Sequence, residues 1–394
     1  MKKFLSALLV VLMCVSMFAF VGCSQTEEFK VGFIFLHDEN STYDKNFIDA
    51  AKLACEKMGV TMVQKTQIPE SEACYEAAKA LIDTDGCNLI FADSFGHEPF
   101  LIQAAKEYPD VQFCHATGVK AHTEGVSNYH NAFASIYQGR YLAGVVAGMK
   151  LNEMIADGTI TADQTKMGYV GAFTFAEVIS GYTSFYLGAK SICPSVTMDV
   201  KFTGSWYDET KEKEAANALI AGGCVLLSQH ADSMGAPTAC EAAGIPNVSY
   251  NGSTAVACPE TFLVSSRINW APYFEYIIGQ AQKGEAIATD WTGTIETDSV
   301  KLTDLGKNVA EGTAAKLEEV KAGLLDGTIN VFDTKNFTVK GETLTTYLAD
   351  VDDDGTYVGE TEAIEGGIFY ESKHRSGPYF DLRIDGITLL DEAY

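Results

Sequence analysis

Two series of short apolar segments, each alternating with helix-type patterns, constrain the fold of this chain more than any other feature. In both series a run rich in apolar residues is followed by a polar loop and then by apolar positions at helical spacing. Alternating strands and helices join by right-handed crossovers and build parallel sheets that helices cover on both faces. The pattern therefore predicts an α/β protein with two open parallel sheets. The predicted strands are 31–36, 60–63, 89–92 and 111–114 in the first series, and 167–171, 197–202, 225–228 and 247–250 in the second.

The order of these segments divides the chain into two similar lobes. A long helix predicted over about 136–154 separates them, and a chain of 394 residues is too long for one small core. A strand at 262–265 and a helix around 273–282 predict a segment that returns to the first lobe, and alternating apolar positions in 336–394 are typical of hairpins. The expected lobes are 29–133 plus about 259–288, and 134–258 plus about 289–394 with the appended hairpins.

The N-terminus has the pattern of an export signal. Lys2 and Lys3 precede an apolar run over 4–21, and Gly22-Cys23 then opens a polar stretch. The small residue directly before a cysteine resembles a bacterial lipobox. That resemblance implies a signal peptide over 1–22, a lipid-modified Cys23, a tether over 23–28 and a location on the extracytoplasmic face of the cell membrane. A transmembrane anchor and an ordinary cleaved signal are the alternatives.

Charge and motif content argue against several classes of partner. Lys and Arg number 28 against 53 Asp and Glu, and a net charge of −25 repels the phosphates of nucleic acid. No Walker loop or G-x-G-x-x-G stretch occurs, and the cysteines show no C-x-x-C spacing. We therefore expect no nucleic-acid partner, no cofactor and no metal. The cysteines after Cys23 read as small buried hydrophobic residues, with disulfides inside each lobe as the alternative.

Aromatic and hydrogen-bonding residues follow nearly every predicted strand. In an open parallel sheet, ligands bind beyond the carboxyl ends of the strands, so these residues are the candidates for a binding site. The combination predicts a cleft for a flat molecule with polar edges. The candidates are Asp38, Tyr43, Phe47, Ser94 and Phe95 from the first series, and Phe173, Glu177, Trp206, His230, Asp232 and Asn251 from the second.

Five ordered motifs resemble the BMP (basic membrane protein) family, whose members are lipoprotein substrate-binding components of ABC importers. The resemblance covers most of residues 29 to about 330 and implies a type I periplasmic-binding-protein fold that closes on its ligand about a hinge of three crossovers. It also implies that the protein is not an enzyme, and that it captures a purine base or nucleoside for an ABC permease and its ATPase subunits. The motifs are Tyr43-Asp44-Lys45-Asn46-Phe47, Tyr108-Pro109-Asp110-Val111-Gln112-Phe113, Gln138-Gly139-Arg140-Tyr141-Leu142-Ala143-Gly144, Met167-Gly168-Tyr169-Val170-Gly171-Ala172-Phe173 and Gly204-Ser205-Trp206-Tyr207-Asp208.

The resemblance also implies an aromatic clamp for the ligand. Carried over by motif, Phe47 from the first lobe and Trp206 from the second would hold a purine ring between them, with Glu177, His230 or Asn251 reading its edge. This sequence departs from the nucleoside-binding pattern at Ile48 and Asn251. Both departures favour a free base over a nucleoside.

Other interpretations of the same residues remain open. Phe47 and Trp206 can be core residues, Trp270 can pack at the hinge or touch ligand, and Glu177 can be a helix cap. The alternative functions are a receptor for a sugar or another small metabolite, and an exported enzyme resembling a nucleoside hydrolase. Asp38, Asp93 and Asp232 would be the acidic residues of such an enzyme. Residues 350–355 match the first half of a calcium loop, although a solvated turn is the preferred interpretation.

Overall fold

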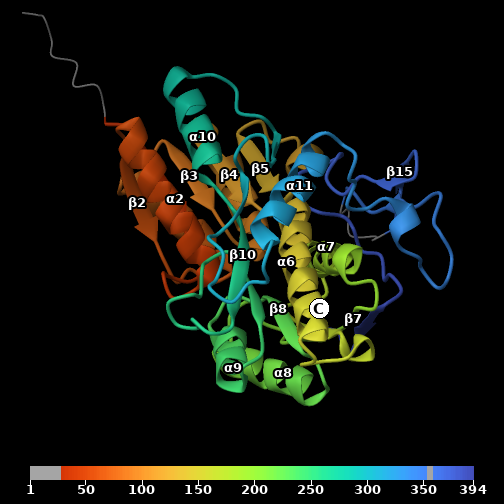
Figure 1. The fold of residues 1–394 in the computed structure, drawn as a ribbon. Helices are drawn as coiled ribbons and strands as arrows, with labels where there is room; N and C mark the ends of the chain where they lie inside the picture. The colour runs from red at the N-terminus through yellow and green to blue at the C-terminus, as the bar shows by residue number, and fades with distance from the viewer. Residues whose placement is uncertain (1–27, 353–357) are drawn as a thin grey trace, which may run out of the picture.

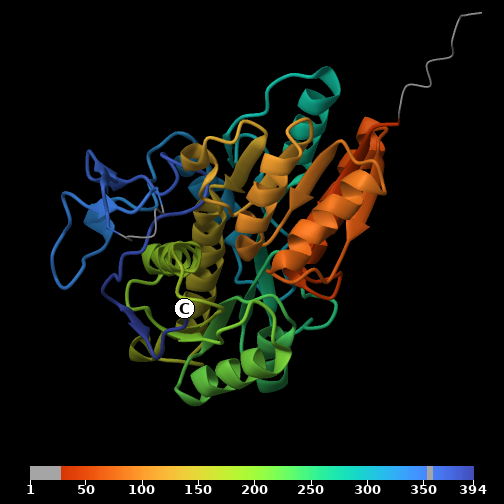
Figure 2. The ribbon, with the colours of Figure 1, turned by 180° about the vertical axis from the view of Figure 1, so that it is seen from behind.

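Two parallel sheets, each with helices on both faces, form the two lobes of the protein (Figures 1 and 2). The structure is a computed structural model that describes residues 28–352 and 358–394. The α/β architecture with two parallel sheets is therefore confirmed. The predicted signal peptide, Cys23 and most of the tether lie outside the described residues.

The first sheet has the strand order β11-β5-β4-β3-β1-β2, with every neighbouring pair parallel. Helices α2 and α10 pack on one face, and α3 and α4 pack on the other. A short helix, α5, lies beside β5. The elements are β1 (Lys30–Ile34), α2 (Thr42–Met58), β2 (Thr61–Lys65), α3 (Glu72–Asp83), β3 (Leu89–Ala92), η1 (Phe95–His97), α4 (Glu98–Glu107), β4 (Gln112–Ala116), α5 (Ala121–Glu124), β5 (Tyr129–Ala134), α10 (Ala271–Lys283) and β11 (Asp290–Gly293).

The second sheet has the order β12-β10-β9-β8-β6-β7-β17, in which only β12 is antiparallel to its neighbour. Helices α6 and α7 pack on one face, and α8 and α9 on the other. Helix α11 packs against α6. The elements are α6 (Ile136–Ala156), η2 (Ala162–Gln164), β6 (Lys166–Gly171), α7 (Ala176–Ile192), β7 (Thr197–Phe202), α8 (Glu209–Ala221), β8 (Leu226–His230), α9 (Gly235–Ala243), β9 (Asn247–Tyr250), β10 (Phe262–Ile268), β12 (Val300–Leu302), α11 (Thr313–Leu325) and β17 (Ile387–Leu389).

Side-chain caps fix where the helices next to the cleft begin. Ser41 precedes α2, and its hydroxyl accepts a hydrogen bond from the Asp44 amide at 3.1 Å. Asp208 precedes α8, and its carboxylate accepts from the Lys211 amide at 3.0 Å. Such caps satisfy backbone donors that the first helical turn leaves unpaired. Each helix therefore starts directly after the strand-end loop that carries the candidate site residues.

The chain crosses between the sheets three times. It passes from β5 into α6, from β10 into α10 and from β11 into β12. The segment that returns to the first lobe was expected to span 259–288. In the structure β10 instead pairs with β9 in the second sheet, and β11 pairs with β5 in the first. The first lobe therefore regains the chain at α10, after the strand that the prediction had assigned to it.

The C-terminal segment contains two small hairpins, as the alternating pattern predicts. They are formed by β13 (Leu348–Ala349) with β14 (Thr361–Glu362), and by β15 (Ile364–Glu365) with β16 (Ile368–Phe369), after the short helix η3 (Thr334–Asn336). The sequence did not predict that β17 would pair in parallel with β7. This pairing covers the edge that β7 would otherwise present to solvent.

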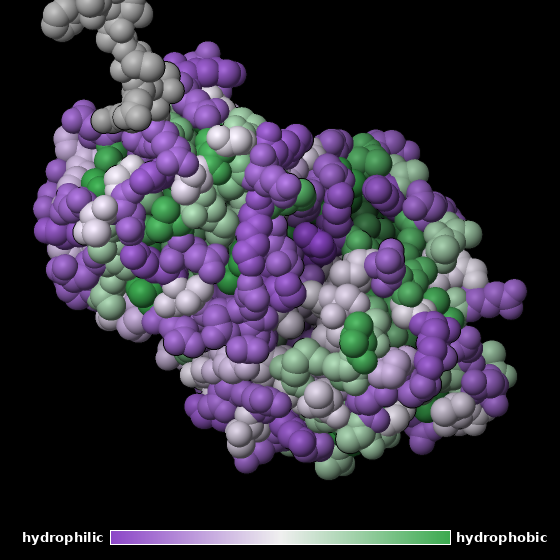
Figure 3. All heavy atoms as spheres, turned by 90° about the vertical axis from the view of Figure 1, so that its left-hand side faces the viewer, coloured by the Kyte–Doolittle hydropathy of each residue, from purple (hydrophilic) through white to green (hydrophobic). Residues whose placement is uncertain are grey.

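The eight cysteines of the described residues are all free and buried, which confirms their interpretation as small core residues. Figure 3 shows hydrophilic side chains spread across the face on the β2 side, with hydrophobic ones in smaller groups between them. No helix within 28–352 or 358–394 is long and apolar enough to cross a membrane.

Candidate ligand-binding site

A cavity lies between the two lobes, at the carboxyl ends of their strands. Its volume is only about 20 Å³, well below the roughly 300 to 1,000 Å³ of typical ligand pockets, so the two walls lie close together in this structure. The first lobe supplies side chains from the segments after β1, β3 and β4 and from the start of α2. The second lobe supplies them from the start of α7, the loop after β7, and the end of β8 with the loop after it. The lining residues are Leu36, Tyr43, Ser94, Phe95, Thr117, Glu177, Trp206, His230 and Asp232.

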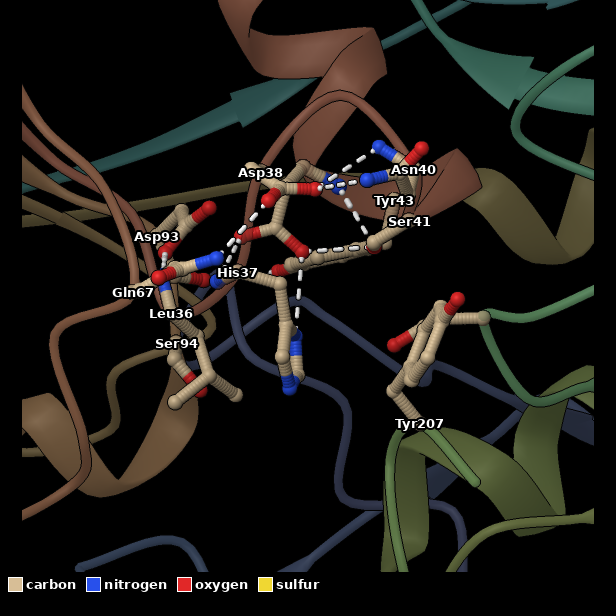
Figure 4. A network of polar contacts seen from close by, with 12 residues as sticks. Leu36, His37, Asp38, Asn40, Ser41, Tyr43, Gln67, Asp93, Ser94 and Tyr207 are labelled. Atoms are coloured by element: carbon tan, nitrogen blue, oxygen red, sulfur yellow. Dashed lines mark hydrogen bonds and ion pairs between the residues drawn. The ribbon is translucent and has the colours of Figure 1, made fainter. Parts of the chain in front are cut away.

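Direct contacts between the lobes show that the cleft is closed. The backbone amide of Thr42 donates to the carbonyl of Asp232 at 2.9 Å, across the two lobes. The rings of Phe95 and Phe175 lie 5.5 Å apart. His37 faces Tyr207 with ring centres 5.3 Å apart, as Figure 4 shows. A ligand in this cavity would therefore be enclosed by both lobes.

Aromatic side chains form much of the cavity wall. Trp206 comes from the second lobe, whereas Tyr43 and Phe95 come from the first. Phe173 packs edge-on against Trp206 with ring centres 5.0 Å apart, and Phe173 in turn stacks on Phe175. The packing of Phe173 against the indole restricts the position of Trp206. Each aromatic pair of this kind contributes roughly 0.5 to 1.5 kcal/mol to stability beyond the effect of its buried area.

Asp232 is a buried acidic group in the cavity wall. Its side chain is only 4% exposed, and among the described residues no hydrogen bond reaches its carboxyl oxygens. Burial, with Asp44 and Glu212 as further causes, raises the pKa of Asp232 well above its usual range. A carboxyl without a partner can accept a hydrogen bond from an N–H on the edge of a ligand.

Glu177 and His230 form a second polar pair in the wall. The imidazole Nε2 of His230 lies 3.2 Å from Oε1 of Glu177. Burial lowers the pKa of His230, so its neutral form is favoured and Nε2–H donates to the carboxylate. Glu177 is the second residue of α7, whose N-cap residue is Phe175, so the same side chain lies in the first helical turn and in the cavity wall.

The first lobe holds its polar side chains through a buried network, part of which is drawn in Figure 4. The Tyr43 hydroxyl donates to the carbonyl of Asp93 at 2.7 Å, and the Asp93 carboxylate accepts from the Leu36 amide at 3.1 Å. Burial, followed by the neighbouring Asp44, raises the pKa of Asp93 well above its usual range. Ser94 donates to Glu70 at 2.6 Å. The network fixes the loops that carry Leu36, Tyr43 and Ser94.

Five of the sequence candidates lie outside the cavity wall. Phe47 is fully buried and stacks on Trp270, with ring centres 4.5 Å apart. Asp38 lies at the surface, where it binds Asn40 and Gln67, and Phe173 stands behind Trp206. Asn251 is buried, with φ 63° and with its side-chain nitrogen unpaired within the described residues. The candidates outside the wall are Phe47, Trp270, Asp38, Phe173 and Asn251.

Two further residues line the cavity, Leu36 and Thr117. Leu36 is the last residue of the first apolar run, and its position directly before the polar loop was the only signal for it. Thr117 directly follows β4, as a strand-end rule predicts, but a threonine there resembles an ordinary loop residue. Nothing in the sequence indicates its left-handed backbone, φ 65°.

The acidic residues of the enzyme interpretation do not meet in one place. Of the three aspartates proposed for a hydrolase, Asp232 lines the cavity, whereas Asp93 is buried and accepts from the Leu36 amide, and Asp38 lies at the surface. The calcium loop remains the alternative to the predicted solvated turn. Asp350, Asp352 and Glu360 bring carboxylate oxygens within 4.8 Å of one another, but 353–355 lie outside the described residues.

Glu212 accepts a hydrogen bond from the loop that carries Asp232. It is fully buried on α8, and its carboxylate accepts from the Ser233 amide at 3.2 Å. Burial raises the pKa of Glu212 from 4.5 to about 7. Because the folded-state pKa is raised, the stability from this group is fully present below about pH 4.5 and is lost as the pH rises through 7.

We therefore expect the free energy of unfolding of Glu212→Gln, measured relative to that of the wild type at the same pH, to be higher at pH 8 than at pH 5. The shift corresponds to an upper limit of roughly 3 kcal/mol in the free energy of unfolding. Urea unfolding at both pH values measures it, with the exposed Glu209→Gln on the same helix as the control. An equal difference between the Glu212 variant and wild type at both pH values would show that Glu212 is not the titrating group.

Comparison with known proteins agrees with the fold and the cleft. The sequence model of a family described as PnrA-like ABC transporter substrate-binding proteins matches residues 34–335. A purine-binding protein of Brucella abortus is 30% identical over 367 residues, which cover 87% of this chain and 99% of that protein. A putative ABC transporter glucose-binding protein of Haloferax volcanii is 31% identical over 62% of this chain and 59% of its own length.

Solved structures share the architecture at low sequence identity. An ABC transporter solute-binding protein from Aeropyrum pernix superimposes with a TM-score of 0.64 and 16% identity, covering 77% of this chain and 92% of that one. At this identity the similarity supports the fold alone.

Proposed function

The chain belongs to the PnrA-like family of ABC transporter substrate-binding proteins, and from that premise we propose that its ligand is a purine base or nucleoside. Proteins of this family bind a small ligand outside the cytoplasm and deliver it to the permease and ATPase of an ABC importer. The whole-length relative named as purine-binding supports the choice of ligand.

One observation carries the proposal. Trp206 from one lobe and Tyr43 and Phe95 from the other line a single small cavity, and the groups beside them both donate and accept hydrogen bonds. Every purine presents a flat π-face and an edge on which donors and acceptors alternate. Stacking on an aromatic side chain contributes roughly 1 to 3 kcal/mol per base in nucleic-acid complexes. The carboxyl of Asp232, which no hydrogen bond from the described residues reaches, is available to pair with such an edge.

The mechanism follows from the closed cleft. The ligand binds to one lobe, and closure about the three crossovers brings the second lobe over it. Closure is favoured because it buries the ring between aromatic side chains and pairs its polar edge. The closed form presents both lobes to the permease in one fixed arrangement, so ligand binding and delivery are coupled.

A sugar is the second candidate ligand, and the halophile relative named as a putative glucose-binding protein favours it. Isothermal titration with adenine, guanine, adenosine and glucose separates the candidates. We expect stoichiometric binding of at least one purine and no heat with glucose. Heat with glucose and none with any purine would transfer the proposal to a sugar.

We further propose that the protein is a receptor and not an enzyme. Asp38 and Asp93 do not share a cavity with Asp232, which supports this choice over a nucleoside hydrolase. Chromatography of a nucleoside after prolonged incubation with the protein tests it. Unaltered nucleoside is the expected result, whereas free ribose would refute a purely binding role.

Membrane anchoring through Cys23 is also a proposal, based on the Gly22-Cys23 junction after an apolar run. We expect Cys23→Ser to move the protein from the membrane fraction of the cells to the soluble fraction, because the acylated residue is lost. Cys14→Ser is the matched control and should leave the protein in the membrane. Continued membrane association of the Cys23 variant would contradict lipidation at this residue.

A further inference from the structure

The segment 371–378, here called the C-terminal strap, is irregular yet largely buried. It follows β16 and has neither helix nor strand, but Glu371 and Ser376 are only 2% and 1% exposed. It lies beyond residue 335, where the match to the family model ends. The blue C-terminal segment of Figures 1 and 2 runs beside α6 and α7, at one side of both lobes. The strap therefore lies outside the segment that the family model matches, and it packs like part of the core.

One end of the strap is attached to the second lobe. The Ser180 hydroxyl on α7 donates to Glu371, and Ser180 lies one turn after the cavity residue Glu177. Beyond the strap, the Arg383 guanidinium donates to the Tyr182 hydroxyl at 3.1 Å, and β17 pairs with β7. The segment thus moves with the second lobe.

The middle of the strap contacts the first lobe. The Ser376 amide donates to the carboxylate of Asp290 on β11 at 2.7 Å. Gly377 packs so closely on the loop after β4 that a Cβ atom there would lie 3.0 Å from the carbonyl oxygen of Gly118 and 3.6 Å from that of Thr117. A segment carried by one lobe therefore rests on the other lobe at the loop that contributes Thr117 to the cavity.

Thr117 is held in an unfavourable conformation at this point. Its φ of 65° is rare for a β-branched residue and persists only where the surroundings impose it. Its amide donates to Ala132 at 3.1 Å from one side, while Gly377 packs against its carbonyl from the other. The next residue, Gly118, has no room for a side chain, since a Cβ would lie 2.0 Å from the side-chain nitrogen Nδ2 of Asn131.

We propose that the C-terminal strap is a working part of the ligand site. It holds Thr117 in position against the cavity and joins the first lobe to the second, so that it favours the closed form. Asp290, Ser376 and Gly377 are positioning residues, because they act through Thr117 and through the arrangement of the lobes. Slower release of the ligand is the expected benefit.

Asp290→Ala tests the proposal because it removes the acceptor of the Ser376 amide. Asp385→Ala is the matched control, since its carboxylate accepts from the Gly341 amide at 2.8 Å within the C-terminal segment. We expect Asp290→Ala to raise the dissociation rate of adenine about three- to tenfold and to increase the radius of gyration of the unliganded protein in small-angle scattering. Asp385→Ala should change neither, and Asp290→Asn, which keeps an acceptor oxygen, should restore the slow rate.

If Asp290→Ala lowered the melting temperature but changed neither the dissociation rate nor the radius of gyration, the strap would have only a structural role. That result would overturn the proposal. If Asp290→Ala does not fold, Gly377→Ala provides the same test by displacing the Gly118 carbonyl. The dissociation measurement rests on the proposed purine ligand. Scattering of the unliganded protein needs no ligand. A wild type that binds neither adenine, guanine nor adenosine would refute the proposed function, and scattering alone would then decide on the strap.

Discussion

Replacing Trp206 with alanine is expected to weaken purine binding more than tenfold and to leave the fold intact. The indole lines the cavity and is only partly buried, so its loss removes a stacking surface without opening the core. Stacking free energies of roughly 1 to 3 kcal/mol correspond to changes in Kd of about 5- to 150-fold. Titration calorimetry measures the affinity, and urea unfolding checks the stability.

Two variants make the Trp206 experiment specific. Trp206→Phe keeps an aromatic face and should recover most of the affinity. Trp291→Ala removes another partly buried indole, which packs on Tyr273 in the first lobe and does not line the cavity. It should bind the purine like the wild type. Equal affinity of Trp206→Ala and wild type would remove this residue from the site.

Replacing Phe47 with alanine should have the opposite result, a large loss of stability. The ring is fully buried between Tyr43, Phe91 and Trp270, with ring centres 4.8, 5.7 and 4.5 Å away. Truncation of a phenylalanine in such a place lowers the free energy of unfolding by about 3 to 5 kcal/mol. Urea unfolding of the unliganded protein measures this loss directly.

The resemblance to relatives had instead given Phe47 a direct role in the aromatic clamp, and Phe47→Leu distinguishes the two roles. Leucine refills most of the volume, so a core role predicts that it retains most of the stability and all of the affinity. Phe100→Ala on α4, where the ring is partly buried, should cost less stability than Phe47→Ala. If Phe47→Leu had normal stability but weaker purine binding, the phenylalanine ring would have a direct role in holding the ligand.

The periodicity of the sequence was sufficient for the fold because each lobe repeats one unit. Runs such as 89–92 and 247–250 are short, apolar and bounded by turn residues, and the strands occur at those positions. β5 and β17 were missed for a physical reason. β5 includes His130 and Asn131, which pair inside the lobe, and β17 exists only because β7 offers an edge. Tertiary contacts, and not local preference, create such strands.

The site could be predicted only as far as the strand-end rule applies. Trp206, Ser94 and Asp232 line the cavity because each lies within four residues of the end of a strand whose carboxyl end faces the cleft. The rule fails inside helices. Tyr43 and Phe47 lie on the same face of α2, one turn apart, but Tyr43 reaches the cavity whereas Phe47 lies one turn deeper against Trp270. Depth along a helix depends on tilt and packing, which the sequence does not encode locally.

A crystal structure of the protein grown with the purine that binds in the titration would locate the ligand. We expect the purine ring in the cavity between the lobes, against Trp206 on one side and Tyr43 or Phe95 on the other, with its edge within hydrogen-bonding distance of Asp232. An empty cavity at a saturating concentration of that purine, or a ring bound elsewhere on the protein, would refute the proposed site.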